Sequence, residues 1–182
     1  MLDNEDLEGA KEKRLSSIRG KKISFVFQNF ALIGDYTVLE NVEVPLIKQQ
    51  ISKAERKKRV LSALELVGIS NLAKKKPSNI SGGQKQRVAI ARAIVCGAET
   101  ILADEPTGNL DEENSDIIFN ALKEVAKNHL VVIVSHNKEA AEKFADRIIT
   151  IRDGRIFDDS DRGYSENSTL ELTEQREKNP KS

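Results

Sequence analysis

The sequence has only one cysteine, Cys96, and no excess of charge of either sign. One thiol cannot form a disulfide within the chain, which favours a reducing compartment. Lys and Arg total 29, as do Asp and Glu, so no net basic field attracts nucleic acid. No apolar run approaches the roughly 18 residues of a membrane span, and no signal-peptide pattern follows Met1. We therefore expect a protein that is neither secreted, membrane-spanning nor fibrous.

The composition indicates an ordinary soluble globular protein. Of the 182 residues, 38% are hydrophobic and 32% are charged, and the length suits one domain. Short apolar runs alternate with longer helical segments, which favours parallel strands in a layered α/β sheet. Strands are expected at residues 23–27, 100–103, 130–134 and 148–151, and helices behind Ser52, around 117–125 and near 138–145.

Local signals mark the ends of several of these elements. Ser52 and Glu55 have the spacing of a capping box, in which the hydroxyl and the carboxylate each bond an end amide. Gly68 is placed to end the helix that follows Ser52. The Asp153-Gly154 pair predicts the tight turn of a hairpin.

Residues 158–182 differ in character from the rest of the chain. Seven acidic against four basic side chains give them a net charge of −3, and few of them are apolar. Such a segment buries too little surface to offset the entropy of ordering. We therefore expect a folded domain over residues 1–157 and a mobile tail or loose helix over residues 158–182.

Two glycines stand at an expected helix start, in the segment Ser81–Gln84. Without a Cβ, Gly82 and Gly83 let backbone amides approach a ligand closely. Unsatisfied amides and the positive end of the helix dipole bind anions, and the Ser81 hydroxyl adds a donor. A plain serine N-cap followed by flexible glycines is the simpler alternative. The longer string Ile-Ser-Gly-Gly-Gln-Lys-Gln-Arg-Val-Ala-Ile-Ala-Arg-Ala resembles the signature motif of ATP-binding-cassette (ABC) ATPases, with Ile80 where Leu is usual.

An acidic pair, Asp104 and Glu105, follows the apolar run at 100–103. A carboxylate at the C-terminal end of a buried parallel strand lies where α/β sheets bind ligands. Asp104 can there hold Mg²⁺, directly or through water, and Glu105 can polarise an attacking water. An acidic turn closed by Pro106 is the alternative. The string Ile-Leu-Ala-Asp-Glu-Pro-Thr-Gly-Asn-Leu-Asp resembles the Walker B motif and D-loop of the same family, which implies that Asp111 lies at the dimer seam.

His136 and Gln28 each follow an expected strand, where a lone polar residue is usually ordinary surface. The imidazole of His136 can donate a hydrogen bond to a γ-phosphate, and its position resembles that of the family's switch histidine. By the same resemblance Gln28 is the Q-loop glutamine, which touches Mg²⁺ and the attacking water and senses the transporter subunit. His129 is expected to be a solvent-facing loop residue.

The resemblance covers roughly residues 10–157 and is greatest to the ABC ATPases of lipoprotein release, macrolide-type export and bacteriocin or antimicrobial-peptide export. It implies a partial P-loop NTPase fold of the α/β class, with a helical subdomain at about 29–95 carrying the signature motif. It also implies ATP hydrolysis, with ATP and Mg²⁺ bound. The implied residues are Glu105 and His136 for catalysis, Gln28, Ser81, Gly82, Gly83, Gln84 and Asp111 for nucleotide binding, and Asp104 and Gln28 for the metal.

The implied partners are the membrane permease of an ABC exporter and a second ATPase subunit, with no nucleic acid expected. This predicts a cytoplasmic protein, peripheral at the inner face of the cell membrane through the permease. The transported substrate is not encoded here, because selectivity in such systems belongs to the membrane subunits.

One motif of the family is missing from these residues. The phosphate loop (Walker A), Gly-x-x-x-x-Gly-Lys-Ser/Thr, cradles the β- and γ-phosphates of ATP. The chain has one Gly-Lys pair, Gly20-Lys21, with Leu15 where the first glycine belongs and Lys22 in place of Ser/Thr. The chain therefore resembles the C-terminal part of an ABC ATPase. By the same resemblance the phosphate-loop strand lies beside residues 130–134, which its absence leaves as an unpaired, aggregation-prone edge.

Three functions are compatible with these patterns. The first is the ATPase component of an ABC exporter, incomplete as given. The second is a non-hydrolysing remnant that offers Ser81–Gln84 to ATP held by a complete partner. The third is a soluble ABC ATPase that acts on nucleic acid or the ribosome. The zero net charge and the lack of a tandem second cassette count against the third function, and the run Lys74-Lys75-Lys76 is interpreted as a solvated loop.

Overall fold

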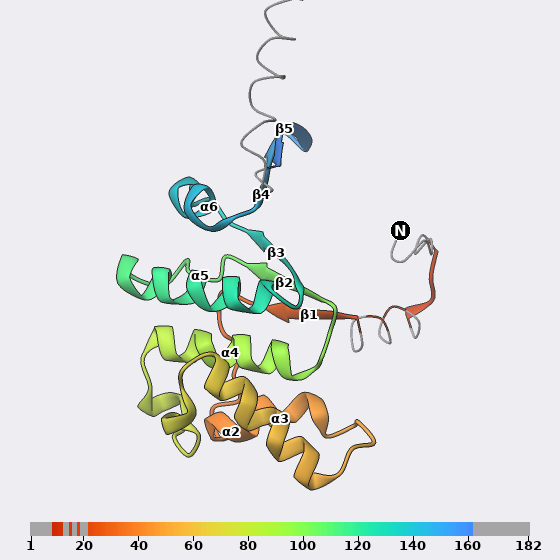
Figure 1. Cartoon of the computed structure of the whole chain (residues 1–182), viewed down its shortest axis with the longest axis vertical. Helices are drawn as coiled ribbons and strands as arrows, with labels where there is room; N and C mark the ends of the chain where they lie inside the picture. The colour runs from red at the N-terminus through yellow and green to blue at the C-terminus, as the bar shows by residue number, and fades with distance from the viewer. Residues whose placement is uncertain (1–8, 13–14, 16–17, 19–21, 162–182) are drawn as a thin grey trace, which may run out of the picture. The chain divides into compact units, whose positions relative to one another are not determined.

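The structure is a computed structural model that describes residues 9–12, 15, 18 and 22–161. The chain divides into two units, the first ending at His136 and the second beginning at Asn137. The elements of both units are labelled in Figure 1. None of the described helices has the length and apolar content needed to cross a bilayer.

The first unit is built on a parallel sheet. Its described strands are β1 (Ile23–Val26), β2 (Thr100–Asp104) and β3 (Leu130–Val134), in the order β1-β2-β3. The register places Phe25 beside Leu102 and Leu102 beside Val132. The three strands predicted from the apolar runs are thus confirmed, and their parallel course brings their C-terminal ends to one edge of the sheet.

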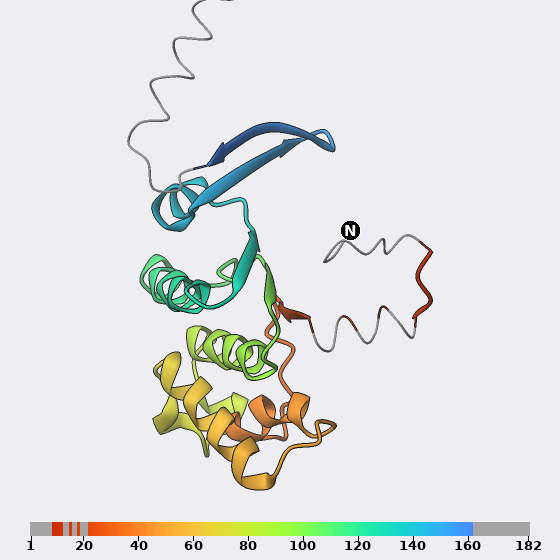
Figure 2. The ribbon, with the colours of Figure 1, turned by 45° about the vertical axis from the view of Figure 1, so that its right-hand side comes forward.

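Two helices cover one face of this sheet, as Figure 2 shows. They are α4 (Gly82–Val95) and α5 (Glu112–Ala126), and they pack against the strands and against each other. The middle of α4 is buried on all sides from Val88 to Ala91, because α2 (Val38–Glu43) and α3 (Lys53–Leu66) cover its other side. Short 3₁₀ helices complete this helical layer at Val44–Leu46, Ser70–Leu72 and Pro77–Asn79.

The helix predicted behind Ser52 is confirmed as α3, but its capping box is only half formed. The Ser52 hydroxyl accepts a hydrogen bond from the Glu55 amide at 3.1 Å. The Glu55 carboxylate does not return to the Ser52 amide, because it pairs with Arg59 one turn further along at 2.8 Å. Gly68 follows α3 with a φ of +67°, as expected of a residue that ends a helix.

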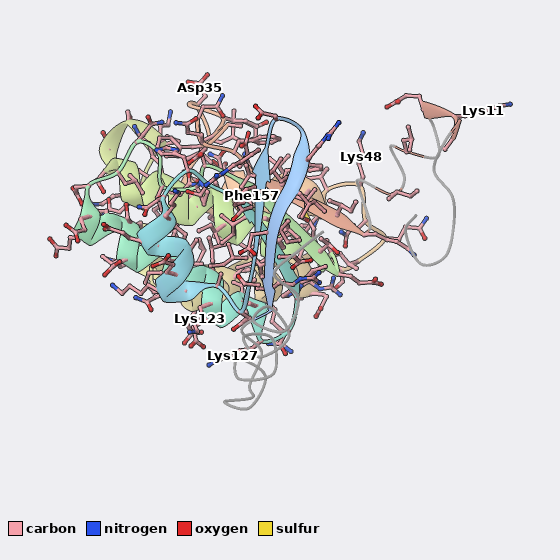
Figure 3. The ribbon with its side chains drawn as sticks, turned by 90° about the horizontal axis from the view of Figure 1, so that it is seen from above. Lys11, Asp35, Lys48, Lys123, Lys127 and Phe157 are labelled. Atoms are coloured by element: carbon pink, nitrogen blue, oxygen red, sulfur yellow. The ribbon has the colours of Figure 1, made fainter. Side chains whose placement is uncertain are left out.

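The helix predicted around 117–125 is confirmed as α5, which has lysines in and just after its last turn. Lys123 lies in that turn, and Lys127 follows it and pairs with Glu124 at 2.7 Å. Figure 3 shows both lysine side chains pointing away from the ribbon. Positive charge at a helix C-terminus compensates the exposed carbonyls, so these side chains stabilise the end of α5.

The second unit contains a helix and a hairpin. Its elements are α6 (Lys138–Phe144), β4 (Arg147–Arg152) and β5 (Arg155–Asp161). The predicted hairpin turn is confirmed, since Asp153 and Gly154 have φ values of +49° and +72°. β5 continues past residue 157, where Asp159 forms a bidentate ion pair with Arg147 at 2.8 and 2.7 Å. Residues 158–161 therefore belong to a strand rather than to the expected tail, and residues 162–182 lie outside the described part of the chain.

The face of the first sheet opposite α4 and α5 is apolar and exposed. Phe25 and Phe27 stack on each other with centroids 5.8 Å apart, and Leu130, Val132 and Val134 are also exposed. Within the described residues, β3 pairs only with β2. Exposed apolar surface next to an open strand edge is a template for aggregation.

We expect the 182-residue chain on its own to be poorly soluble or molten. Val132→Thr should raise its soluble fraction, because the change reduces apolar character on the exposed face of β3. The matched change Val131→Thr should lower it, since Val131 packs against the core and its replacement by Thr costs about 1–3 kcal/mol. Soluble yield and dye binding measure both effects. A sharp, cooperative thermal transition of monomeric wild-type chain would contradict the expectation.

Candidate functional site

Four of the predicted site residues lie at the C-terminal edge of the parallel sheet. Gln28 comes two residues after β1, Asp104 ends β2 and Glu105 follows it directly, and His136 comes two residues after β3. Each reaches this edge because all three strands run in the same direction. This is the edge at which parallel α/β sheets bind ligands.

Glu105 has a backbone conformation that is unusual for a glutamate. Its φ is +43°, in the left-handed region, and its amide donates to the carbonyl of Val134 at 2.9 Å. A non-glycine residue in this region costs on the order of 1–3 kcal/mol, and such residues gather at functional sites. The strained turn directs the Glu105 side chain toward the residues that follow β3.

Glu105 and His136 are in direct contact. Glu105 Oε1 accepts from the His136 amide at 3.0 Å and lies 2.8 Å from His136 Nδ1. The Ser135 hydroxyl donates to Oε2 at 3.4 Å. The Glu105 side chain is only 22% exposed and that of His136 is 83% exposed. The structure thus joins the two predicted catalytic residues, with the carboxylate shielded and the ring facing solvent.

This contact determines what the His136 ring can donate. A carboxylate that accepts from Nδ1 requires a proton on that nitrogen. A neutral ring then has only a lone pair at Nε2. Donation to a phosphate from Nε2 therefore needs either the imidazolium form or a ring released from Glu105.

Gln28 is held against the segment that follows β2. A Cβ on Gly108 would lie 2.6 Å from Gln28 Nε2, so the glutamine side chain passes where only a glycine fits. Asn109 Nδ2 also donates to the Gln28 carbonyl at 3.4 Å. These contacts place the ends of β1 and β2 side by side.

Arg92 holds the loop after Gln28 from the other side, and no sequence signal indicated this role. Phe30 and Ala31 both have left-handed φ values, +62° and +46°. From α4, Arg92 Nη2 donates to the Phe30 carbonyl at 2.9 Å and Nη1 to the Ala31 carbonyl at 2.6 Å. Burial lowers the pKa of the Arg92 guanidinium. A desolvated cation with two carbonyl partners ties the loop to α4.

We expect Arg92→Met to speed chymotrypsin cleavage after Phe30 by at least about tenfold. The change removes two charge-assisted hydrogen bonds worth about 1.5–3 kcal/mol each, and 1.4 kcal/mol already corresponds to tenfold. Arg92→Lys keeps the positive charge but loses the second nitrogen donor of the guanidinium. Its cleavage rate should lie between those of the wild type and Arg92→Met. Cleavage kinetics followed by mass spectrometry provide the measurement. Equal cleavage rates in all three proteins would show that Arg92 does not restrain this loop.

The predicted anion-binding segment forms the start of α4. Ser81 is the N-cap, and its hydroxyl accepts from the Gln84 amide at 3.3 Å while Gln84 Oε1 accepts from the Ser81 amide at 3.0 Å. This complete capping box leaves the Ser81 hydroxyl hydrogen available, and the amides of Gly82 and Gly83 have no partner within the helix. Within the described residues, no hydrogen bond joins this segment to the four residues at the sheet edge.

Asp111 is the N-cap of α5. Its Oδ1 accepts from the Asn114 amide at 2.9 Å, and Asn114 Nδ2 donates to both carboxylate oxygens at 2.9 and 3.0 Å. These hydrogen bonds hold the pKa of Asp111 below its ordinary value. Asn114 was not singled out from the sequence, although a short polar residue three positions after an N-cap aspartate is a local signal for such a contact.

The oxygen donors at the sheet edge suit magnesium that arrives with a nucleotide. Among the described residues no group of three or more His, Cys, Asp or Glu side chains is arranged to hold a metal. Mg²⁺ is usually bound through one or two carboxylates together with substrate phosphates and water. The Asp104 carboxylate and the Gln28 amide oxygen are donors of the kind it prefers, so they fit a nucleotide-bound ion.

His129 is not the solvent-facing loop residue that was expected. It is half-buried, and its Nδ1 lies 2.7 Å from the carbonyl of Ala98. The backbone also connects here, because the Leu130 amide donates to the Glu99 carbonyl at 2.9 Å. The His129 ring thus provides a partner for the Ala98 carbonyl at the point where β3 begins beside β2. This is a structural role.

Comparisons with known proteins agree with this geometry. The family model described as "ABC transporter" matches residues 1–108. The uncharacterized ABC transporter ATP-binding protein YknY of Bacillus subtilis is 46% identical over 158 residues, covering 85% of this chain and 67% of YknY. The macrolide export ATP-binding/permease protein MacB of Brucella melitensis is 42% identical over 161 residues, covering 88% of this chain and 25% of MacB.

Solved structures show the same likeness. The dimeric structure of MJ0796, described as a bacterial ABC transporter cassette, matches with a TM-score of 0.77 and 40% identity over 90% of this chain and 73% of MJ0796. A post-hydrolysis dimer of MJ0796 bound to ADP and Pi also has a TM-score of 0.77, with 39% identity and the same coverage. The predicted α/β fold and the resemblance read from the motifs are confirmed.

Proposed function

The chain belongs to the ABC transporter family of ATPases, and from this we propose that it is the ATP-binding and ATP-hydrolysing component of an exporter. The observation that carries the proposal is the pairing of Glu105 with His136 beside Asp104 at the edge of the parallel sheet. Names of relatives that describe macrolide export support the export direction.

In the proposed reaction, water attacks the γ-phosphorus of ATP and the bond to the β-phosphate oxygen breaks, giving ADP and phosphate. The Glu105 carboxylate accepts the proton from the attacking water. Its Oε1 is engaged by His136 here, so the ring turns away to bond the γ-phosphate and thereby frees the base. Ser135 keeps its contact with Oε2 and holds the carboxylate in place.

Asp104 and Gln28 would hold Mg²⁺ in the nucleotide complex. When bound, the ion neutralises charge on the β- and γ-phosphate oxygens. Gln28 is positioned for this by the narrow passage over Gly108 and by the Arg92 contacts with the loop that follows it.

We also propose that the segment Ser81–Gln84 and Asp111 serve a nucleotide held by a second ATPase subunit. The absence of hydrogen bonds between this segment and the sheet edge, within the described residues, supports two separate roles. The dimeric form of the similar MJ0796 cassette supports such a pair. A membrane permease would complete the transporter and hold the chain at the cytoplasmic face of the cell membrane.

The test joins this chain to YknY in a composite site, in which ATP bound by YknY is contacted by Ser81–Gly83 of this chain. YknY disabled in its own signature segment should regain phosphate release when this chain is added. Ser81→Arg in this chain should remove that gain, because a bulky side chain at the N-cap closes the approach to the amides. Failure of the wild-type chain to restore any activity would overturn the proposal of a shared site.

A second candidate function is a subunit that contributes only its signature segment. It is favoured by the start of α4, where the capping box leaves the Ser81 hydroxyl hydrogen and the first backbone amides available to a ligand from outside the subunit. Glu105→Gln separates the two candidates in the complete transporter, because a signature-only subunit does not use Glu105 of its own sheet edge and keeps full transport. Loss of transport by the complete transporter after the same substitution would instead favour the hydrolysing subunit.

A further inference from the structure

The first turn of α4 packs tightly against the start of α5, which lies beside it in Figure 1. A Cβ on Gly83 would lie 2.6 Å from Asn114 Oδ1 and 3.0 Å from its Cγ. Real Cβ atoms essentially never approach other atoms so closely, so a side chain at position 83 would displace Asn114. A Cβ on Gly82 would meet only the end of the Leu110 side chain, at 3.4 Å.

The other end of the Asn114 side chain holds Asp111. Nδ2 donates to Oδ1 at 2.9 Å and to Oδ2 at 3.0 Å, so both carboxylate oxygens are fixed by one amide group. The Asn114 backbone amide adds a third bond, to Oδ1 at 2.9 Å. The Asn114 carboxamide therefore bridges two of the predicted nucleotide-binding groups, with its oxygen against Gly83 and its nitrogen on Asp111.

We propose that Asn114 is a positioning residue that sets the spacing between Asp111 and the first turn of α4, so that both reach the nucleotide of the second subunit together. This inference rests on the proposed function of Ser81–Gln84 in a shared site. Two constraints then require glycine at position 83. One is the close approach of a ligand to the backbone, and the other is the Asn114 carboxamide, which occupies the space that a Cβ would take.

A double-mutant cycle in the composite site separates the two reasons. Gly83→Ala alone is expected to lower phosphate release by roughly tenfold, even though alanine has the higher helix propensity. Asn114→Ser removes the carboxamide but keeps a hydroxyl donor for Asp111. In that background, Gly83→Ala should lower the rate by clearly less than in the wild-type background, because the new Cβ no longer meets Oδ1 and only its effect on the approach of the ligand remains.

Asn114→Asp tests the bond to Asp111. The change keeps the shape of the side chain but places a carboxylate against the Asp111 carboxylate, so kcat should fall by roughly tenfold. The KM for ATP should change little, because the partner holds the nucleotide, whereas general unfolding of the chain would abolish activity altogether. Asn114→Ser should keep more of kcat than Asn114→Asp does, because its hydroxyl can still donate to Asp111. Asn128→Ser, on an exposed loop residue, is the matched control.

Amide hydrogen exchange provides a readout that needs no activity. Gly83→Ala should speed exchange at the Asn114 amide, and Asn114→Ser should remove that difference. If the composite site with the wild-type chain releases no phosphate, that result counts against the proposed function. The exchange rates still test whether position 83 contacts Asn114. The inference is overturned if Gly83→Ala is equally harmful in both backgrounds, or if Asn114→Asp matches wild type in kcat.

Discussion

Glu105→Gln is expected to lower ATP turnover by about 10²- to 10⁴-fold, the range of a lost general base, while ATP binding is retained. The measurement requires this chain fused to the phosphate-loop segment of YknY, so that nucleotide is held in place. Glutamine keeps the length of the side chain and an oxygen that can accept from the His136 amide and Nδ1. The neutral side-chain amide of glutamine cannot accept a proton from water. The substitution therefore slows the hydrolysis step and leaves ATP binding unchanged.

Matched variants make this result specific. Glu99→Gln changes an exposed glutamate just before β2 and should leave turnover unchanged. Glu105→Gly would relieve the left-handed φ of +43° but remove the carboxylate, so it should be as inactive as Glu105→Gln. Phosphate release and nucleotide binding are measured on the same preparations. Wild-type turnover in Glu105→Gln would remove Glu105 from the role of base.

The 182-residue chain by itself is expected to show no appreciable ATPase activity. A phosphate loop would supply several charge-assisted hydrogen bonds, each worth about 1.5–3 kcal/mol. Losing three of them costs on the order of 6 kcal/mol, or roughly a 10⁴-fold loss of nucleotide affinity. The sheet edge is a poor substitute, because the Asp104 and Glu105 carboxylates repel phosphate.

The corresponding experiment measures phosphate release at millimolar Mg-ATP, with nucleotide binding followed by calorimetry. The fusion of this chain with the phosphate-loop segment is the positive control. Its activity would show that the C-terminal edge of the parallel sheet folds correctly. Two copies of this chain should be as inactive as one, since each signature segment would face phosphates that neither copy cradles. Turnover by the chain alone that survives extensive purification and disappears in Glu105→Gln would refute the expectation.

The sheet and its edge could be predicted because their signals are local. The apolar run Leu130–Val134 has the pattern of a strand, and the structure forms β3 over those same residues. Strand polarity then brings Gln28, Asp104 and His136 to one edge without any knowledge of packing. Sequence spacing and the geometry of parallel sheets were therefore sufficient to predict the strands and the residues at their C-terminal ends.

The contacts that orient these residues could not be predicted in the same way. Arg92 meets Phe30 and Ala31 across 62 and 61 positions of sequence, so no local pattern reveals the pairing. Glu55 failed as a capping partner because Arg59 offered a charged donor to the same carboxylate. His129 was misassigned because its partner carbonyl, at Ala98, is brought near only when β2 and β3 pair. The roles of the predicted nucleotide ligands, Gln28, Ser81, Gly82, Gly83, Gln84 and Asp111, stay predictions.

The parallel pairing of β1 with β2 has a consequence for how the chain is made. More than 70 residues separate Val26 from Thr100, and all of α2, α3 and α4 must be synthesised between them. At ribosomal speeds of about 5–20 residues per second, β1 waits roughly 4–15 s for its neighbour to emerge. During that time β1 lacks β2, the strand that pairs with it among the described residues. Folding of the nascent chain therefore depends on early condensation of the helical layer, which shortens the loop that β1 and β2 have to close.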